Sequence, residues 1–256
     1  MGLLALLSWD RVQKNLIPLA YLRALGRFMI YMQAEESVYS AYVPLLGGRT
    51  DSQPLTQYPT EALLSLVMLY EKDRSDLWLT QAYGQLAYLA QYREQTNNIP
   101  ADPWTLLAIK KILSFKDLEG FSISQELLIN HAIQICKVIL QQQVHDPRQS
   151  RYDGGFGKDG RTVPTAIWLE GLLAALSFLP RNQDIAARIR AAVTRGINFL
   201  LRAQIADGEF VGAIPRAVGK LRSRRASDFN QRATEIRIDY VQHTMNAWMQ
   251  YLTLAQ

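Results

Sequence analysis

Apolar residues at helical spacing recur in segment after segment, and this pattern restricts the fold of the chain more than any other feature. In the segment that starts near Pro59, for example, Leu63, Leu64 and Val67 lie on or near one helix face, and the proline opens the first turn. No strand pattern stands out outside the loops, so the chain is predicted to be all-α. The segments with helical spacing cover residues 9–16, 18–33, 58–72, 75–94, 102–115, 123–143, 163–179, 183–204 and 234–255.

Four of these segments end in a similar way, in or near a glutamine that is followed by a turn. The glutamines are Gln33, Gln91, Gln143 and Gln204, so the steps between them are 58, 52 and 61 residues by subtraction. After three of them the turn is polar and contains an aromatic residue. The repeating unit is therefore predicted to be a helical hairpin of about 55 residues.

The connections between these helices differ in length. The turn inside a hairpin is short, whereas the loop between hairpins is long and rich in glycine, aromatic and charged residues, most clearly in residues 151–161. If the hairpins alternate inner and outer helices around a ring, the long loops gather at one edge and lead into the inner helices. Loops often carry function, and helix N-termini present free N–H groups, so this edge is predicted to be the mouth of a cavity.

The length of the chain limits the size of such a ring. A closed ring of six hairpins needs about 330 residues, whereas this chain provides about four and a half hairpins. We expect residues 1–256 to form a single α/α domain, an incomplete or small ring of about four to five hairpins. The chain is expected either to be complete or to be one domain of a longer protein.

Composition narrows the class of protein. The chain is 48% hydrophobic and 20% charged, as soluble globular proteins are. No apolar stretch approaches the roughly 20 residues that span a bilayer, and the first residues lack a basic leader. A cytoplasmic protein with no membrane span is therefore expected.

Charge and cysteine usage are also informative. The net charge of +5 is modest, and no nucleic-acid partner is expected. The densest basic run, residues 219–232, favours a solvated loop, with binding of an anionic glycan or nucleic acid as the alternative. The single cysteine, Cys136, lies in an apolar helical run and is interpreted as a buried small hydrophobe.

Two groups of residues resemble known families. The sequences "YDGGFG…TAIWLEGLLAAL" and "GINFLLRAQIADGEF" resemble the repeats of protein prenyltransferase β-subunits and squalene-cyclase-type enzymes. Residues 58–89 resemble six-hairpin glycosidases and N-acylglucosamine 2-epimerase-like enzymes, which begin a helix with tyrosine-proline-x-glutamate. Together these resemblances cover most of residues 20–255 and imply the α/α toroid fold.

The chain departs from both isoprenoid families where their chemistry is concerned. Protein prenyltransferases bind zinc through aspartate, cysteine and histidine, whereas the one cysteine here lies in an apolar helix. Squalene cyclases use an aspartate-rich DxDD motif, which this sequence lacks. No two histidines have metal-ligand spacing either, so neither a metal nor another cofactor is expected.

Several polar and aromatic residues lie near helix starts and are the candidates for chemistry. The candidates for acid–base catalysis are Glu61, Asp153, Glu170, Asp239 and His243. The candidates for substrate binding are Tyr58, Asp102, Trp104, Phe156, Arg161, Arg237 and Tyr240. Each has a structural alternative: a carboxylate in a first helical turn, an aspartate in a glycine turn, or an aromatic residue in the core.

The segment around His243 is the most suggestive. Asp239 and His243 are at i and i+4, so an aspartate is expected to orient the imidazole, either for general acid–base catalysis or as a structural pair. Glu170 lies in an apolar helix and is costly to bury unless it is paired. Arg161 or Arg237 is the expected partner.

Three functions follow as hypotheses. The first is a carbohydrate-active enzyme (glycoside hydrolase, epimerase or lyase-like) with a polar and aromatic funnel at the loop edge, where two carboxylates flank the scissile bond. The second is a non-catalytic toroid that binds a glycan or a protein, with its polar residues paired to one another. The third is a terpenoid cyclase or prenyltransferase-like enzyme.

Overall fold

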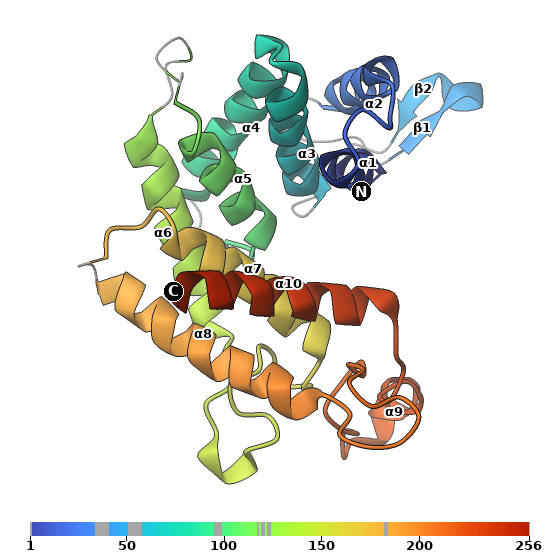
Figure 1. Cartoon of the computed structure of the whole chain (residues 1–256), viewed down its shortest axis with the longest axis vertical. Coiled ribbons are helices and arrows are strands. Elements are labelled where there is room, and N and C mark those ends of the chain that lie inside the picture. The colour runs from blue at the N-terminus through green and yellow to red at the C-terminus, as the bar shows by residue number, and fades with distance from the viewer. Residues whose placement is uncertain are drawn as a thin grey trace. The chain divides into compact units, whose positions relative to one another are not determined.

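The structure is a computed structural model, which describes residues 2–33, 41–50, 58–94, 99–116, 118, 121, 124–181 and 184–255. Ten α-helices form most of this part of the chain, so the all-α prediction is confirmed (Figure 1). One small antiparallel sheet was not predicted, and it pairs β1 (Ala41–Val43) with β2 (Gly48–Thr50) across the 3₁₀ turn η1 (Pro44–Leu46). The chain divides into two compact units, Met1–Ala132 (unit 1) and Ile133–Gln256 (unit 2).

Unit 1 is built around α3. Its helices are α1 (Gly2–Val12), α2 (Leu19–Tyr31), α3 (Tyr58–Asp73), α4 (Asp76–Glu94), α5 (Pro103–Leu113) and the first part of α6 (Gln125–Gln141). The helices α1, α2, α4 and α5 all contact α3. Leu66, Val67 and Leu69 of α3 are fully buried, as expected for a helix that is apolar on most sides. Burial of this central helix therefore organises unit 1.

The first helix begins earlier than the sequence pattern suggested. We expected a segment over residues 9–16, whereas α1 spans Gly2–Val12. Leu3 and Leu7 are one helical turn apart and are both buried, so they anchor α1 to the rest of unit 1. The expected boundary was wrong because the packing of these two leucines, rather than the later residues, determines where α1 begins and ends.

Unit 2 has the same plan, with α7 (Thr162–Leu176) at its centre. The helices α8 (Asp184–Ala203) and α10 (Ile238–Ala255) both contact α7. The N-termini of α7 and α10 lie together, because the Thr162 amide donates to the Arg216 carbonyl (3.0 Å) and Pro215 pairs with Ile236. Figure 1 shows α7 and α10 running in one direction and α8 in the other. The short α9 (Ser227–Gln231) lies in the run that was expected to be a loop.

The predicted repeat is visible in two turns of unit 2. After α6, the Gln143 side chain donates to the Gly154 carbonyl (2.9 Å), and the Gly154 amide donates to the Val144 carbonyl (2.9 Å). After α8, Gln204 donates to the Gly212 carbonyl (2.9 Å), and the Gly212 amide donates to the Ile205 carbonyl (2.9 Å). Gln143 and Gln204 therefore hold the turns that follow α6 and α8 in the same way.

Both turns require glycine where the chain reverses. Gly154 and Gly212 have φ of +86° and +88°, in the left-handed region that favours glycine. A Cβ on Gly154 would also lie 2.3 Å from the Arg195 carbonyl oxygen of α8. Of the other glutamines, Gln33 also follows the end of a helix, whereas Gln91 lies inside α4, so the helix end expected there was wrong.

The expected absence of a membrane span agrees with the helices of the structure. Across the described part of the chain, every helix is too short or too polar to cross a bilayer. The single domain and the toroidal ring stay predictions.

Candidate functional site

A buried contact between a histidine and a glutamate joins the two parallel helices of unit 2. The His243 Nδ1 of α10 lies 2.7 Å from the Glu170 Oε1 of α7, and the side chains are 10% and 9% exposed. Asn246 contributes a longer contact of 3.5 Å to the second carboxylate oxygen. The prediction that Glu170 is paired is confirmed. The expected partners, Arg161 and Arg237, were wrong.

Asp239 and His243 do not form the pair that was expected, because each has another partner. Asp239 accepts a hydrogen bond from Arg237 Nε at 2.9 Å, and the two side chains are 36% and 53% exposed, respectively. Asp239 lies in the first turn of α10, where the preceding arginine can reach it, whereas His243 lies one turn later against α7. The i,i+4 spacing was correct, but packing against α7 supplied a closer carboxylate than the one on the same helix.

A hydrogen-bonded chain fixes the start of α10. Glu235 accepts from Arg232 Nε (2.6 Å) and from the Tyr240 hydroxyl (2.9 Å). These two donors lower the pKa of Glu235 to about 2. Burial and the neighbouring Glu235 carboxylate raise the pKa of Tyr240. The Arg237 guanidinium lies over the Tyr240 ring, 5.4 Å from its centroid.

The glycine-rich stretch before α7 places its candidates in structural contacts. Asp153 accepts from the Asp146 amide (3.0 Å) and lies 3.3 Å from His145 Nδ1, the local role given as its alternative. Phe156 is fully buried, with its ring against Trp168. Arg161 bonds to the Asp159 carboxylate through Nε at 2.7 Å.

The unit 1 candidates also lie in structural settings. Asp102 is buried, accepts from the Thr105 amide as the N-cap of α5 (3.2 Å), and pairs with Arg93 (2.9 Å). Glu61 lies half-buried in the first turn of α3, and Trp104 is half-buried in α5. Tyr58 begins α3, but its side chain lies outside the described residues.

The candidates therefore divide between the units. Tyr58, Glu61, Asp102 and Trp104 belong to unit 1, and the rest belong to unit 2. Their convergence on one funnel stays a prediction.

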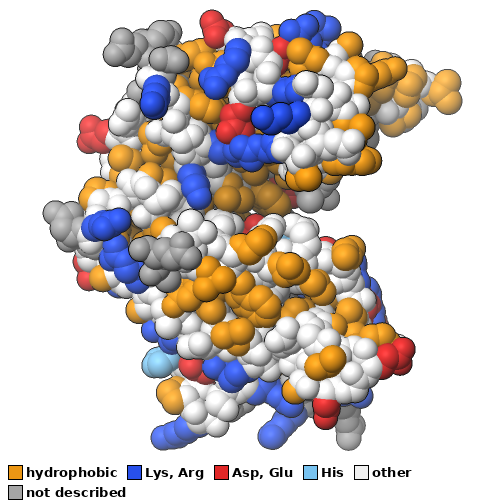
Figure 2. All heavy atoms as spheres, in the orientation of Figure 1, with side chains coloured by type: hydrophobic (Ala, Val, Ile, Leu, Met, Phe, Trp, Pro, Cys, Tyr) orange, Lys and Arg blue, Asp and Glu red, His pale blue; other side chains and the backbone are white. Residues whose placement is uncertain are grey.

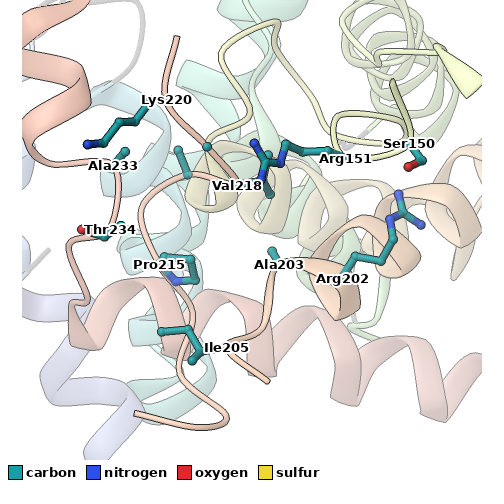
Figure 3. A pocket seen from close by; sticks show the side chains of 12 residues that line it. Ser150, Arg151, Arg202, Ala203, Ile205, Pro215, Val218, Lys220, Ala233 and Thr234 are labelled. Carbon is teal, nitrogen blue, oxygen red and sulfur yellow. The ribbon is translucent and has the colours of Figure 1, made fainter. Parts of the chain in front are cut away.

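The loops of unit 2 form a pocket of about 880 Å³, which we call the loop pocket (Figure 3). Its apolar lining comes from Ala203, Ile205, Pro215, Ala217 and Val218, and its polar lining from Ser150, Arg151, Arg202, Lys220 and Thr234. These residues belong to the ends of helices and to the loops before α7 and α10. The structure therefore brings the two long loops of unit 2 together around one pocket.

A second pocket of about 740 Å³, the rim pocket, adjoins the first. The two share Ser150, Arg151 and Lys220. Together their walls carry basic side chains that we call the basic cluster: Arg148, Arg151, Lys158, Arg202, Lys220 and Arg222. Figure 2 shows Lys and Arg side chains at the end of unit 2 where these loops lie.

The basic cluster lacks neutralising carboxylates. Within the described ranges, none of its six members forms an ion pair with Asp or Glu, and Asp146 is the one acidic residue in the walls of the two pockets. Arg202 donates to the Asp153 backbone carbonyl at 2.6 Å. All six side chains are exposed. The cluster therefore presents positive charge to solvent from the walls of a concave surface.

A pocket in unit 1 provides a contrast. It has a volume of about 570 Å³, and two carboxylates, Asp10 and Glu71, lie among its four basic side chains. Lys72 pairs with Asp10 (2.7 Å), and Arg11 pairs with Glu71 (3.1 Å). Carboxylates therefore neutralise part of the basic charge in this pocket, whereas the basic cluster of unit 2 has no such ion pair among the described residues.

Sequence reasoning missed most of the basic cluster. Lys220 and Arg222 belong to the basic run, but the run was expected to be a solvated loop because it lacks apolar periodicity. Arg151 and Arg202 were not considered, because they are far from that run in the sequence. The available signal was the basic run itself, with its alternative interpretation as an anion-binding segment.

The described His, Cys, Asp and Glu side chains bear on whether a metal or a reactive thiol could act here. Where side chains are described, no three His, Cys, Asp or Glu residues gather closely enough to hold a metal ion. Cys136 is fully buried in α6, as expected, and burial raises the pKa of its thiol to about 12.

Comparisons with known protein families, with curated proteins and with solved structures found no match to this chain.

Proposed function

We propose that this chain is a non-catalytic binding domain for an acidic oligosaccharide, which the basic cluster of unit 2 holds. The observation that carries the proposal is the set of six basic side chains around two adjoining pockets, with no ion pair to a carboxylate among the described residues. Like charges gathered in a concave surface raise the local positive potential, and an anionic ligand relieves it.

The chemistry of the pockets suits carboxylate or sulfate groups on a sugar. An arginine guanidinium matches the planar geometry of a carboxylate with two parallel hydrogen bonds, as Arg151 and Arg202 can. The hydroxyls of Ser150 and Thr234 can bond to sugar hydroxyls. Volumes of about 880 and 740 Å³ lie within the range of small-ligand sites. Two discrete pockets suit a short oligosaccharide better than a long nucleic acid.

The pairing of the acid–base candidates supports a binding role over a hydrolytic one. A glycoside hydrolase needs two carboxylates on either side of the scissile bond. In unit 2, Glu170 bonds to His243, Asp239 to Arg237, and Asp153 to the Asp146 amide. The carbohydrate-active enzyme, which was the first hypothesis, stays a prediction. The loop pocket has no aromatic lining, so it does not favour the terpenoid alternative.

The α/α toroid is part of the same proposal. Support comes from the two equivalent glutamine turns and from the parallel α7 and α10 with α8 antiparallel to them. In such an arrangement the long loops lie at one edge, where the basic cluster is found.

The test is isothermal titration of the full chain with tetragalacturonic acid and, as a matched neutral ligand, maltotetraose. We expect the acidic tetrasaccharide to bind, with an affinity that falls as salt is added, and the neutral one not to bind. The double variant Arg151→Gln, Lys220→Gln should lose binding, whereas Arg188→Gln, an exposed arginine of α8 outside both pockets, should keep it.

Two results would contradict the proposal. Equal binding of maltotetraose, or no binding of either sugar, would contradict an acidic ligand. The non-catalytic role can be checked by incubating tetragalacturonic acid with the wild-type chain and measuring new reducing ends. The release of shorter sugars would contradict it.

A further inference from the structure

The loop pocket and the rim pocket share one wall, made by Ser150, Arg151 and Lys220. Figure 3 shows Arg151 between the two sides of the loop pocket, with Arg202 and Ser150 on one side and Lys220 and Thr234 on the other. A ligand that crosses this wall therefore meets basic groups of both pockets.

The two pockets differ in polarity. The rim pocket holds five members of the basic cluster, whereas the loop pocket holds three and is otherwise largely apolar. Sugar rings have apolar C–H faces beside their polar groups, so the apolar wall of the loop pocket suits a sugar ring. The rim pocket, with more basic side chains, suits the end of the oligosaccharide that carries most acidic groups. The difference indicates a preferred direction for a bound oligosaccharide.

Gly219 explains where Arg151 lies. A Cβ built on Gly219 would be 2.6 Å from Arg151 Nη1 and 3.1 Å from Arg151 Cζ. The Gly219 backbone is outside the left-handed region, so alanine could adopt the same conformation. The missing side chain therefore gives the guanidinium its place at the shared wall, and alanine would displace the end of a flexible side chain without removing a charge.

We infer that the two pockets form one bipartite site for an oligosaccharide with at least two acidic groups, and that Gly219 is a positioning residue for Arg151 at the junction. This inference rests on the proposed function. One acidic group lies in the rim pocket, among Arg148, Lys158 and Arg222. A second acidic group bonds to Arg151 and Arg202, and its sugar ring packs on the apolar wall of the loop pocket.

The first test is a length series on the full wild-type chain, with galacturonic acid, digalacturonic acid and tetragalacturonic acid in isothermal titration. Galacturonic acid can occupy one subsite and tetragalacturonic acid two, so the second subsite predicts an affinity for tetragalacturonic acid at least about tenfold higher, the size of one charge-assisted contact. If galacturonic acid and tetragalacturonic acid bind with the same affinity per molecule, the bipartite site is wrong.

The second test is Gly219→Ala, with Gly208→Ala as the control for a glycine in an open turn. We expect Gly219→Ala to weaken the binding of tetragalacturonic acid about tenfold, the size of one charge-assisted hydrogen bond. The variant should have the same melting temperature as the wild type. In an Arg151→Gln background the same substitution should have no further effect, because the group that it displaces is absent.

The outcomes separate the inference from the proposal beneath it. The positioning role is wrong if the Gly219→Ala variant binds tetragalacturonic acid as tightly as the wild type does. It is also wrong if Gly219→Ala weakens binding by the same factor in the Arg151→Gln background as in the wild type. In both cases the proposed function stands. If the wild-type chain binds none of the three acids, the proposed function itself is wrong.

Discussion

Removal of one partner of the Glu170–His243 pair should destabilise the chain strongly. His243→Ala leaves the Glu170 carboxylate, only 9% exposed, with a weak 3.5 Å contact from the Asn246 side chain. Breaking a buried pair costs about 3–5 kcal/mol, and the remaining contact favours the lower end, about 3 kcal/mol. For a chain of this size, that corresponds to a melting temperature lower by about 6–12 °C.

The assay is thermal unfolding followed by circular dichroism, with three further variants. Glu170→Gln keeps the size and a hydrogen-bonding group, so it should cost about 1 kcal/mol. The double variant Glu170→Leu, His243→Leu removes both polar partners and should melt near the wild type. Asp239→Ala, which breaks an exposed pair, should cost less than about 1 kcal/mol.

The result that would refute this reasoning is a His243→Ala variant that melts within 2 °C of the wild type, a limit of about 1 kcal/mol at this size. A double variant less stable than either single change would refute it as well. Either result would mean that the pair does not hold α7 against α10, and it would favour an acid–base role for His243 and Glu170.

Three other predictions concern particular residues. Gly154→Ala should cost about 3 kcal/mol in unfolding free energy, from left-handed strain and contact with a carbonyl, whereas Gly208→Ala, with open space around it, should cost about 1 kcal/mol in the same denaturant titration. The lowered pKa of Glu235 stabilises the fold above about pH 4.3, and this stabilisation is lost as the pH falls toward about 2. In Glu235→Gln the free energy of unfolding should therefore change less with pH over that range. An unchanged pH dependence would contradict the lowered pKa. Cys136 should resist a thiol reagent at pH 8 in the native chain and react in denaturant; rapid native labelling would show that α6 opens.

The helices could be predicted from the sequence because their signals are local. Apolar spacing and a proline in the first turn located α3 and α5 nearly to the residue. The glutamine repeat was also predictable, since Gln143 and Gln204 fix their turns with bonds to nearby glycines. The helix end at Gln91 was wrong because α4 continues without a breaking residue.

The pairing of side chains could not be predicted because it depends on packing between distant segments. The partner of His243 is Glu170, 73 residues away, rather than its neighbour on the same helix. The basic cluster shows the same effect, since Arg151, Arg202 and Lys220 come from three segments. Composition showed only a modest net charge, and the fold concentrated part of it on one surface.

The central claim, an acidic ligand at the basic cluster, is tested most directly by hydrogen–deuterium exchange of the full chain with and without saturating tetragalacturonic acid. The account predicts slower exchange in residues 144–160 and 215–222, which form the walls of the two pockets. Protection confined to unit 1 or to the helix around His243, with these loops unchanged, would contradict it.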